Sequence, residues 1–499
     1  MKNNKWRIKV SGICILLLLL GGFILKNTPH KTVTTDNEVK IAKGKKVDSN
    51  SDGNTSGEGN TNDYTIKNAS QGIYDLNLKM DKNGKFSVKA NIEVKNKGEE
   101  SWDNLVFYFI PNVFTKENKP EKMKSAGTVH MQKVTLDGSD ISYTLDKDTL
   151  LIKLTNKMVK GESHQVSIQY QFTVPDDGFR FTKTKNGNYH LAQWYPMLAY
   201  YTHGWLKHPY MPNSETYHTA HTDFTLSYQI PKGYIFTSTA PNENSDATSG
   251  EVKANNVKEM FVGILKNQEM QQETIDGIQI RVFAPAGHKQ VLQKSFQTVK
   301  EVVHYYNQKI GKYPYPQLDV LLEEDSDSME YPEIVTVGIT DDQRGLNHTI
   351  AHEIAHQWFY GMVSEDPYTD GWLDEGLAEL TAALYCYLAG GESAEKSFEL
   401  ATNLSNAITQ PGPSNLPLDQ FPEYHTYSYL YGQPVIMLKE LFEEHGGLKN
   451  GFKFLAAYFN TYKFKEVNTN EFVHFAETYY HLKNRDFFMG WLDINKEDK

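Results

Sequence analysis

The stretch HEIAH, His352 to His356, sets two histidines and a glutamate at a spacing that a helix would bring to one face. Positions i and i+4 lie one turn apart, so His352 and His356 can aim both imidazoles at one point. Glu353 lies at the edge of that point, where its carboxylate can hydrogen-bond a water molecule. Asn347 or Thr349 could cap such a helix. These residue types therefore predict a metal site with an acid beside it.

A further glutamate strengthens this prediction. Eighteen residues separate His356 from Glu375, which lies in GWLDEGLAEL, and this gap accommodates a loop and a return helix. Two histidines and one glutamate leave the fourth position of a tetrahedral zinc ion for water, as a catalytic zinc requires. We therefore predict one Zn²⁺ on His352, His356 and Glu375, although such a site also accepts cobalt or manganese. The alternative is that Glu375 only caps its own helix.

The segments HEIAHQWFYG and GWLDEGLAE together resemble the gluzincin zinc aminopeptidases, the family of membrane alanyl aminopeptidase and leukotriene hydrolase. The family pattern is HExxH followed, after eighteen residues, by the glutamate of W-L-N-E-G, and Asp374 here replaces the asparagine. The resemblance is strong over residues 350–380 and diffuse elsewhere. It implies a compact bacterial, membrane-anchored member with an α+β multidomain fold. In that fold an all-β, sandwich-like domain precedes an α-rich, thermolysin-like zinc metallopeptidase domain.

The resemblance also implies substrate-binding residues. A family strand, G-x-M-E-N, carries a glutamate that binds the free α-amino group of a peptide. The stretch DSMEYPEIV supplies Met329 and Glu330, while Asp327 and Tyr331 replace the glycine and asparagine. Gln193, in HLAQWYPM, matches a residue of the β domain that reaches the site beside this glutamate. From composition alone, Glu330 would be a solvated acid and Gln193 an ordinary strand-edge residue.

A third family motif, Y-x-K-G-A, contains a tyrosine that stabilises the tetrahedral intermediate. The matching stretch is TYSYLYGQPVIMLKEL. Aligning Gly432 with the family glycine makes Tyr429 the catalytic tyrosine, with Tyr431 at the lysine position and Tyr427 as a competitor if the register slips. With Glu353 as the base, the resemblance implies removal of N-terminal residues from peptides. The alternatives are a zinc endopeptidase, another amide or small-molecule hydrolase, or a surface-tethered binding module with a silent site.

The start of the chain predicts export. Residues 1–26 contain a basic segment and then an apolar run, Val10 to Leu25, typical of an uncleaved membrane anchor with the rest of the chain outside the cell. The alternative is a signal peptide whose cleavage would release a secreted protein. Residues 27–67 are rich in Asn, Ser, Thr and Gly and predict a disordered linker. Because Cys14 and Cys386 are the only cysteines, a disulfide within the exported part is excluded.

Periodicity divides the remaining chain in two. Alternating apolar and polar residues, as in FSVKANIEVKN, predict an all-β domain over residues 68–284. A helical stripe that includes Leu292, Phe296 and Val303 then begins an α-rich catalytic domain with a small sheet near its start, residues 285–499. Helical patterns dominate from Leu346 onward.

The formal net charge of −11 becomes −16 without the five positive residues of positions 1–26. This acidic balance argues against a nucleic-acid partner and limits membrane contact to the N-terminal segment. The sequence does not determine the oligomeric state.

The other histidines and acids near these motifs receive less specific interpretations. His203, His208, His218 and His221 are scattered in a strand region, so no second metal site is predicted there. Glu379 lies one turn after Glu375, where its carboxylate could orient a ligand histidine.

Overall fold

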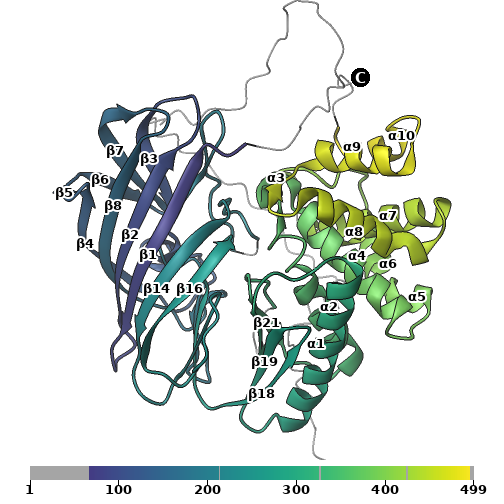
Figure 1. Cartoon of the computed structure of the whole chain (residues 1–499), viewed down its shortest axis with the longest axis horizontal. Coiled ribbons are helices and arrows are strands. Elements are labelled where there is room, and N and C mark those ends of the chain that lie inside the picture. Colours follow the sequence, from purple (N-terminus) through teal and green to yellow (C-terminus); the bar gives the residue numbers. More distant parts are fainter. Residues whose placement is uncertain (1–66, 213, 325–327, 423–424, 495–499) are drawn as a thin grey trace, which may run out of the picture.

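The computed structural model describes residues 67–212, 214–324, 328–422 and 425–494, which form a β-rich body beside a helix-rich body (Figure 1). The predicted anchor over residues 1–26 and the predicted linker, except for its last residue, lie outside the described residues. Among the described helices, none combines the length and the apolar character needed to span a bilayer.

The first body is built on a seven-stranded sheet with the order β16-β14-β1-β2-β8-β4-β5. Its strands alternate between buried and more exposed residues; in β2, for example, Phe86, Val88 and Ala90 are buried, whereas Lys89 is exposed. One face of the sheet therefore covers smaller inner sheets, β15-β17-β10-β9, β11-β3-β7-β6 and β12-β13. The strands are β1 (Ser70–Met80), β2 (Phe86–Asn96), β3 (Trp102–Tyr108), β4 (Thr128–Leu136), β5 (Ser139–Asp140), β6 (Tyr143–Asp146), β7 (Thr149–Met158), β8 (Ser163–Thr173), β9 (Phe181–Lys183), β10 (Tyr189–Leu191), β11 (Met197–Leu198), β12 (Tyr200–Tyr201), β13 (Trp205–Leu206), β14 (Thr222–Gln229), β15 (Ile235–Ser238), β16 (Ser249–Val257) and β17 (Val262–Leu265).

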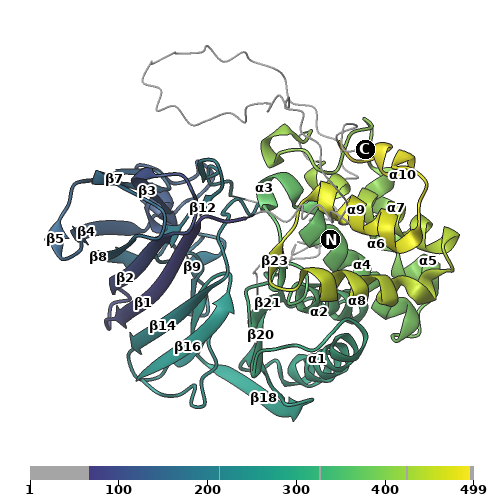
Figure 2. The same cartoon turned by 45° about the horizontal axis from the view of Figure 1, so that its top comes forward.

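The second body begins with a four-stranded sheet, in the order β18 (Gln268–Ile275), β19 (Ile278–Pro285), β20 (Gln317–Glu323) and β21 (Ile334–Gly338). The strand β19 pairs with β20 in parallel, and α1 (Lys289–Lys309) forms the crossover between them. Figure 2 shows α1 alongside this sheet. The boundary predicted at 284/285 is therefore wrong, because it cuts β18 and β19 from the sheet that they share with β20 and β21. By sheet topology the second body begins just after β17.

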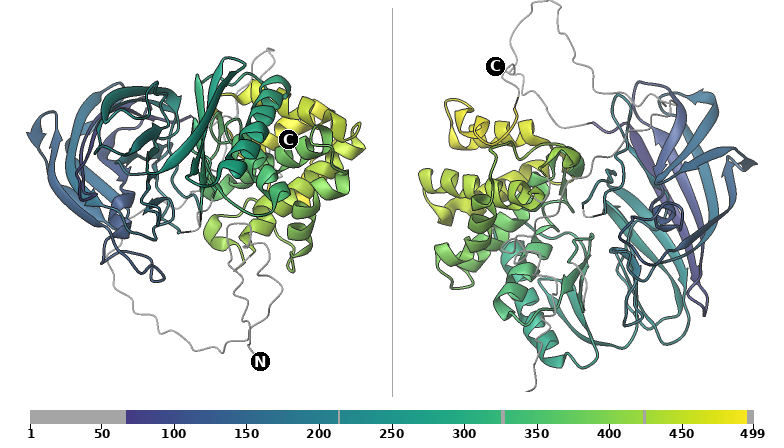
Figure 3. Two further views of the ribbon diagram at one scale, coloured as in Figure 1. Left: turned by 90° about the horizontal axis from the view of Figure 1, so that it is seen from below. Right: turned by 180° about the vertical axis from the view of Figure 1, so that it is seen from behind.

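Helices form the rest of the second body, as predicted from Leu346 onward (Figure 3). The helix α2 begins at Gln343, and Asp342 caps it by accepting a hydrogen bond of 3.1 Å from the Arg344 amide. The predicted caps, Asn347 and Thr349, lie inside the helix instead. The elements after β21 are α2 (Gln343–Ala355), β22 (Val363–Ser364), α3 (Pro367–Asp370), α4 (Trp372–Leu388), α5 (Ala394–Ser397), α6 (Glu399–Asn406), a π-helical turn (Ser428–Gly432), α7 (Gln433–Glu444), α8 (Gly451–Tyr462), β23 (Lys465–Glu466), α9 (Thr469–Tyr480) and α10 (Asp486–Met489).

Polar contacts join the two bodies. Nε2 of His221 lies 2.9 Å from the carbonyl oxygen of Gly361, and the Tyr315 hydroxyl donates to the carbonyl of Asn256 over 2.8 Å. These hydrogen bonds connect the β-rich body to the helix-rich body.

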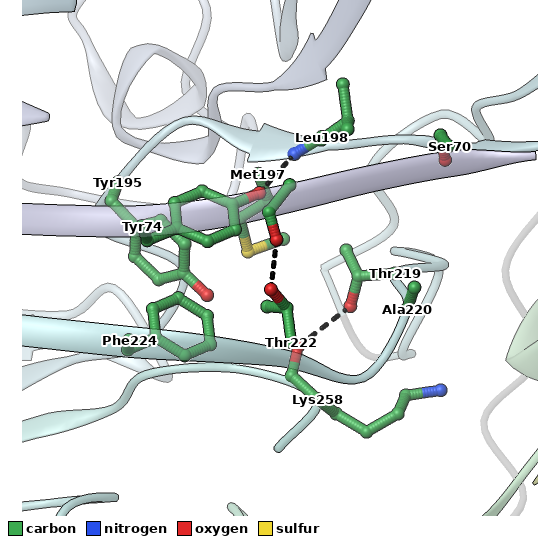
Figure 4. Close-up of a pocket in the computed structure, with 11 residues that line it drawn as sticks. Ser70, Tyr74, Tyr195, Met197, Leu198, Thr219, Ala220, Thr222, Phe224 and Lys258 are labelled. Carbon is green, nitrogen blue, oxygen red and sulfur yellow. Dashed lines mark hydrogen bonds between the residues drawn. The ribbon is translucent and has the colours of Figure 1, made fainter. Parts of the chain in front are cut away.

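Lys258, just after β16, also lies between the two bodies. Its backbone borders a small pocket next to Thr219, and its side chain extends away from the aromatic rings of that pocket (Figure 4). The Lys258 ammonium lies 5.4 Å from the centroid of the Tyr360 ring in the helical body.

Candidate metal centre

Three side chains predicted as ligands converge where α2 packs against α4. Nε2 of His352 and Nε2 of His356 are 3.1 Å apart, and each lies 3.3 Å from Oε2 of Glu375. Ligand atoms around a tetrahedral zinc ion are roughly 3.3 Å apart when each bond is about 2.0–2.1 Å. Two imidazole nitrogens and one carboxylate oxygen are also donors that zinc prefers. The residues therefore fit one Zn²⁺.

Two carboxylates contact the Nδ1 atoms of the ligand histidines, on the side of each ring that faces away from the metal position. Nδ1 of His352 lies 3.2 Å from Oε2 of Glu379, and Nδ1 of His356 lies 2.5 Å from Oδ1 of Asp374. Burial raises the pKa of Glu379, but His348 and His352 outweigh this effect and hold the pKa at about 2. An ionised carboxylate on Nδ1 keeps the proton there and directs Nε2 toward the metal position. The orienting contact predicted for Glu379 is present.

Close packing holds α4 in place. A Cβ atom on Gly376 would lie 2.9 Å from Cγ of Pro434 and 3.0 Å from the carbonyl oxygen of Leu430. Only glycine allows α4 to approach the π-helical turn and the start of α7 this closely. Glu375, the neighbouring residue, is thereby brought to the histidines.

Glu353 lies on the edge of the cluster and is buried. Among the described residues, no hydrogen bond reaches its Oε2. Burial raises the pKa of Glu353 to about 7, against the opposing effect of His352 and His356. One carboxylate oxygen each from Glu353 and Glu330 lies within 4.8 Å of a ring nitrogen of His356. This placement suits an acid that exchanges a proton beside the metal.

The segment predicted to bind the substrate amine lies beside the edge strand β21. Met329 pairs with Thr336 through backbone hydrogen bonds of 3.0 and 2.8 Å, and the next residue, Glu330, is buried next to the cluster. Burial, followed by the charge of Glu215, raises the pKa of Glu330 well above its usual range. Tyr331 stacks on Phe261 with ring centroids 4.1 Å apart, so it fills space at the position of the family asparagine. Asp327 lies outside the described residues.

Glu215 is an acid that the sequence reasoning missed. Carboxylate oxygens of Glu215, Glu330 and Asp374 lie within 4.8 Å of one another. Oε1 of Glu215 accepts a hydrogen bond of 2.7 Å from the Arg180 guanidinium, whereas Oε2 is buried with no hydrogen-bond partner among the described residues. The only sequence signal was an acid between polar residues in NSETYHTAH. Glu215 therefore brings an unsatisfied carboxylate oxygen from the β domain to Glu330.

Gln193 does not take the position predicted for it. It is buried, and its Nε2 donates to Oε2 of Glu259 over 3.2 Å. The other oxygen of Glu259 accepts from the Tyr217 hydroxyl over 2.8 Å, and that hydroxyl lies 3.0 Å from Glu215. Gln193 thus supports the surroundings of Glu215 through two intermediate residues. The residue of the β domain whose carboxylate lies beside Glu330 is Glu215, in the segment between β13 and β14.

Tyr431, and not Tyr429, lies at the metal cluster. The Tyr431 ring stacks on His352 with centroids 5.7 Å apart, and burial, followed by the charge of the nearby Glu375 carboxylate, raises the pKa of its hydroxyl. The Tyr429 hydroxyl donates to the carbonyl of Gln410, and its ring stacks on Phe421. Residues two apart on a helical turn point to nearly opposite sides, so only one of the two can face the site.

The prediction for Tyr429 came from aligning Gly432 with the glycine of Y-x-K-G-A. With Tyr431 in the tyrosine position, Pro434 takes the place of that glycine. Pro434 is the residue that packs against Gly376 of α4.

Residues 294–491 match the model of the peptidase family M1 domain. Leukotriene A-4 hydrolase from Xenopus laevis is 25% identical over 251 residues, which cover 47% of this chain and 40% of that protein. Aminopeptidase N from Acetobacter pasteurianus is 30% identical over 122 residues, which cover 21% of this chain and 34% of that protein. The chain thus spans less than half of the length of either relative.

The fold is shared with a solved M1 zinc metallopeptidase from Deinococcus radiodurans. The TM-score is 0.61 at 15% identity, and the match covers 86% of this chain and 95% of that chain. A mutant of the Deinococcus protein, with a TM-score of 0.61 and 16% identity, has been solved bound to a Tyr-Ser-Ala substrate. The match over residues 294–491 confirms the predicted family resemblance, and the shared fold confirms the predicted α+β order of a β-rich body before a helical one.

Proposed function

Because residues 294–491 form a peptidase family M1 domain around two histidines and a glutamate, we propose that this protein is a zinc-dependent aminopeptidase acting on peptides. The observation that carries the proposal is the pair of buried acids, Glu330 and Glu215, beside the cluster. Their carboxylate oxygens lie within 4.8 Å of each other and of Asp374. An α-ammonium group is the part of a peptide that such an arrangement binds.

His352, His356 and Glu375 would hold the zinc ion. When bound, zinc polarises the scissile carbonyl and acidifies a water molecule. Glu353 accepts the proton of the attacking water and returns it to the leaving amine, a role for which a pKa near neutrality is suited. The burial of Glu353 also keeps competing bulk water away from this proton transfer.

Tyr431 is the donor for the negative charge that develops on the carbonyl oxygen. Its hydroxyl lies near Glu375, a proposed metal ligand, and is therefore within reach of an oxygen bound next to that ligand. Stacking on His352 restricts the ring before the substrate arrives. Such a preorganised donor lowers the barrier because it need not reorient during the reaction.

Glu330 and Glu215 select peptides with a free N-terminus. Buried acids without a neutralising cation are costly, and Arg180 accompanies only one oxygen of Glu215. A substrate ammonium would supply the missing positive charge and place the first peptide bond near Glu353. An acetylated N-terminus carries no charge and would leave these carboxylates unpaired.

The test uses the purified full chain with zinc and two identical peptides, one free and one acetylated at the N-terminus. Mass spectrometry of the products should show stepwise loss of residues from the free peptide alone. Glu330→Gln and Glu215→Gln should each lower kcat/KM for the free peptide by about 10- to 100-fold, since a hydrogen bond to a charged group contributes about 1.5–3 kcal/mol. Glu324→Gln, at a surface acid, is the matched control.

Internal cleavage of both peptides at equal rates would instead identify an endopeptidase. Absence of cleavage of either peptide by zinc-loaded protein would favour the binding module with a silent site.

We also propose that the protein acts at the outer face of the cell membrane, held by residues 1–26. The support is the order of a basic segment before an apolar run in the sequence. Protease treatment of intact cells should release an active fragment while cytoplasmic proteins stay intact. Recovery of all the activity from the culture medium would indicate the secreted form.

A further inference from the structure

A second group of metal-ligating side chains lies between the two domains. His208 and His218 precede β14 in the β domain, and Asp366 caps α3 in the helical domain. One ligand atom from each of the three lies within 4.8 Å of the other two. We propose that these residues form a second metal site, which binds zinc or a similar divalent transition metal and fastens the two domains together.

Asp366 forms a hydrogen bond with one histidine of this cluster and a longer contact with the other. Nε2 of His208 lies 2.8 Å from Oδ2 of Asp366, whereas Nδ1 of His218 lies 3.6 Å from the same oxygen. A separation of 3.6 Å is too long for a hydrogen bond but is close to the roughly 3.3 Å between ligands of a tetrahedral zinc ion. The Asp366 oxygen thus faces both imidazoles, while its Oδ1 caps α3 by accepting from the Tyr368 amide.

His218 is the residue that needs a further partner. Its side chain is fully buried, and no hydrogen bond from the described residues reaches Nδ1. Leaving such a nitrogen unsatisfied costs about 1–3 kcal/mol. A metal ion bound to Nδ1 would remove that cost.

A carboxylate stands on the far side of the His218 ring. Oε1 of Glu466, in β23, lies 2.7 Å from Nε2, although the contact is too bent for a good hydrogen bond. An acid on the second ring nitrogen is the arrangement that Asp374 and Glu379 provide for the histidines of the first site. Glu466 would therefore orient His218 toward the metal.

Aromatic stacking holds both imidazoles in place. The Tyr200 ring stacks on His218 with centroids 4.2 Å apart and planes 8° apart. The Tyr368 ring stacks on His208 with centroids 4.2 Å apart and planes 11° apart. Because each ring is restricted, binding a metal would require little reordering of the ligands.

The local charge suits a cation. Asp366 and Glu466 contribute two carboxylates near His218, and Lys258 contributes one positive charge. The balance is negative when the imidazoles are neutral, as metal ligands must be. Two nitrogens and one carboxylate oxygen favour zinc over magnesium or calcium, which prefer oxygen ligands.

The site would have a structural consequence. Asp366 lies nine residues before Glu375, in the loop that leads through α3 to α4. A metal there would tie this loop to the β domain, which carries Glu215. It would thereby hold Glu215 of the β domain in a constant position relative to the His352, His356 and Glu375 cluster of the helical domain.

The test counts zinc in the full chain after equilibration with excess zinc and desalting. Atomic absorption should give two zinc ions per chain for the wild type and one for His208→Gln, at a side chain that is 16% exposed. His352→Gln should also retain one, and the double variant none. His203→Gln, at a histidine of the same segment with 95% exposure, is the matched control and should retain two.

Asp366→Asn is a second variant, because asparagine still caps α3 while binding zinc poorly. It should also retain one zinc ion. One zinc in the wild type, unchanged by His208→Gln, would overturn the proposal and leave an interdomain ion pair. A second zinc that His203→Gln removes as readily as His208→Gln would be surface binding and would overturn it too. Because the readout is metal content, its failure is independent of any failure of the proposed peptidase activity.

Discussion

Replacing Tyr431 by phenylalanine is expected to lower kcat by about 10²- to 10³-fold, or about 3 kcal/mol of transition-state stabilisation. The variant retains the ring that stacks on His352 and removes only the hydroxyl that faces Glu375. KM should change little, because the donor acts on charge that develops only in the transition state.

The same change at Tyr429 is expected to act on stability instead. Its hydroxyl donates to the carbonyl of Gln410, away from the metal cluster. Loss of such a hydrogen bond costs about 0.5–1.5 kcal/mol of folding free energy. The kcat of Tyr429→Phe should therefore stay within about threefold of the wild type, an effect of less than 1 kcal/mol.

The assay is steady-state hydrolysis of an unblocked peptide, with zinc content and thermal unfolding measured for each variant. Zinc content separates loss of the oxyanion donor from loss of metal caused by a disturbed Glu375, which lies near the Tyr431 hydroxyl. Tyr427→Phe is the matched third variant, since its exposed ring lies 5.4 Å from that of Tyr431.

A large loss of kcat in Tyr429→Phe with an unaffected Tyr431→Phe would refute the reasoning and restore the alignment on Gly432. A large loss in Tyr427→Phe alone would place the donor one turn earlier.

Three other outcomes are expected. Glu353→Gln should lower kcat by about 10²- to 10⁴-fold with zinc content unchanged, since its carboxylate is not one of the three ligands; loss of zinc would contradict this role. Burial raises the pKa of Glu259 to about 7, so ionising it destabilises the fold as pH rises from about 4.5 to 7. Denaturant titrations should therefore show that the wild type loses about 3 kcal/mol of unfolding free energy relative to Glu259→Gln over that range. A stability difference between the two that does not change with pH would disprove the raised pKa of Glu259. Gly432→Ala should lower stability by about 1–3 kcal/mol, because a Cβ would lie 2.6 Å from the Ser405 amide nitrogen; Gly412→Ala, with 3.5 Å to its nearest neighbour, is the control in thermal unfolding.

The metal ligands could be identified from sequence because their geometry is local. The i, i+4 spacing of His352 and His356 places both rings on one face of any helix, whatever surrounds it. The prediction of Glu375 as the third ligand required only a second helix that returns toward the first, and α4 is that helix. The strands of the β domain could be predicted for a similar reason. In a strand such as β2, apolar and polar residues alternate because one face of the strand is buried, and this pattern is local in sequence.

The sequence was less informative where a prediction depended on register or on a shared sheet. Tyr429 and Tyr431 are both tyrosines in an apolar, aromatic stretch, and composition does not reveal which one faces the cluster. The predicted domain boundary at 284/285 was wrong because the sequences of β18 and β19 resemble those of the strands before them. Pairing of β19 with β20 assigns them to the second sheet.

The metal chemistry could be inferred from the sequence, because His352, His356, Glu375 and the acid Glu353 follow from spacing within two helices. The residues that complete that chemistry come together only when the chain is folded. Glu215 meets Glu330, and His208 and His218 meet Asp366, across an interface between segments more than a hundred residues apart. Such encounters depend on how two independently patterned bodies pack, and one-dimensional periodicity carries no record of that packing.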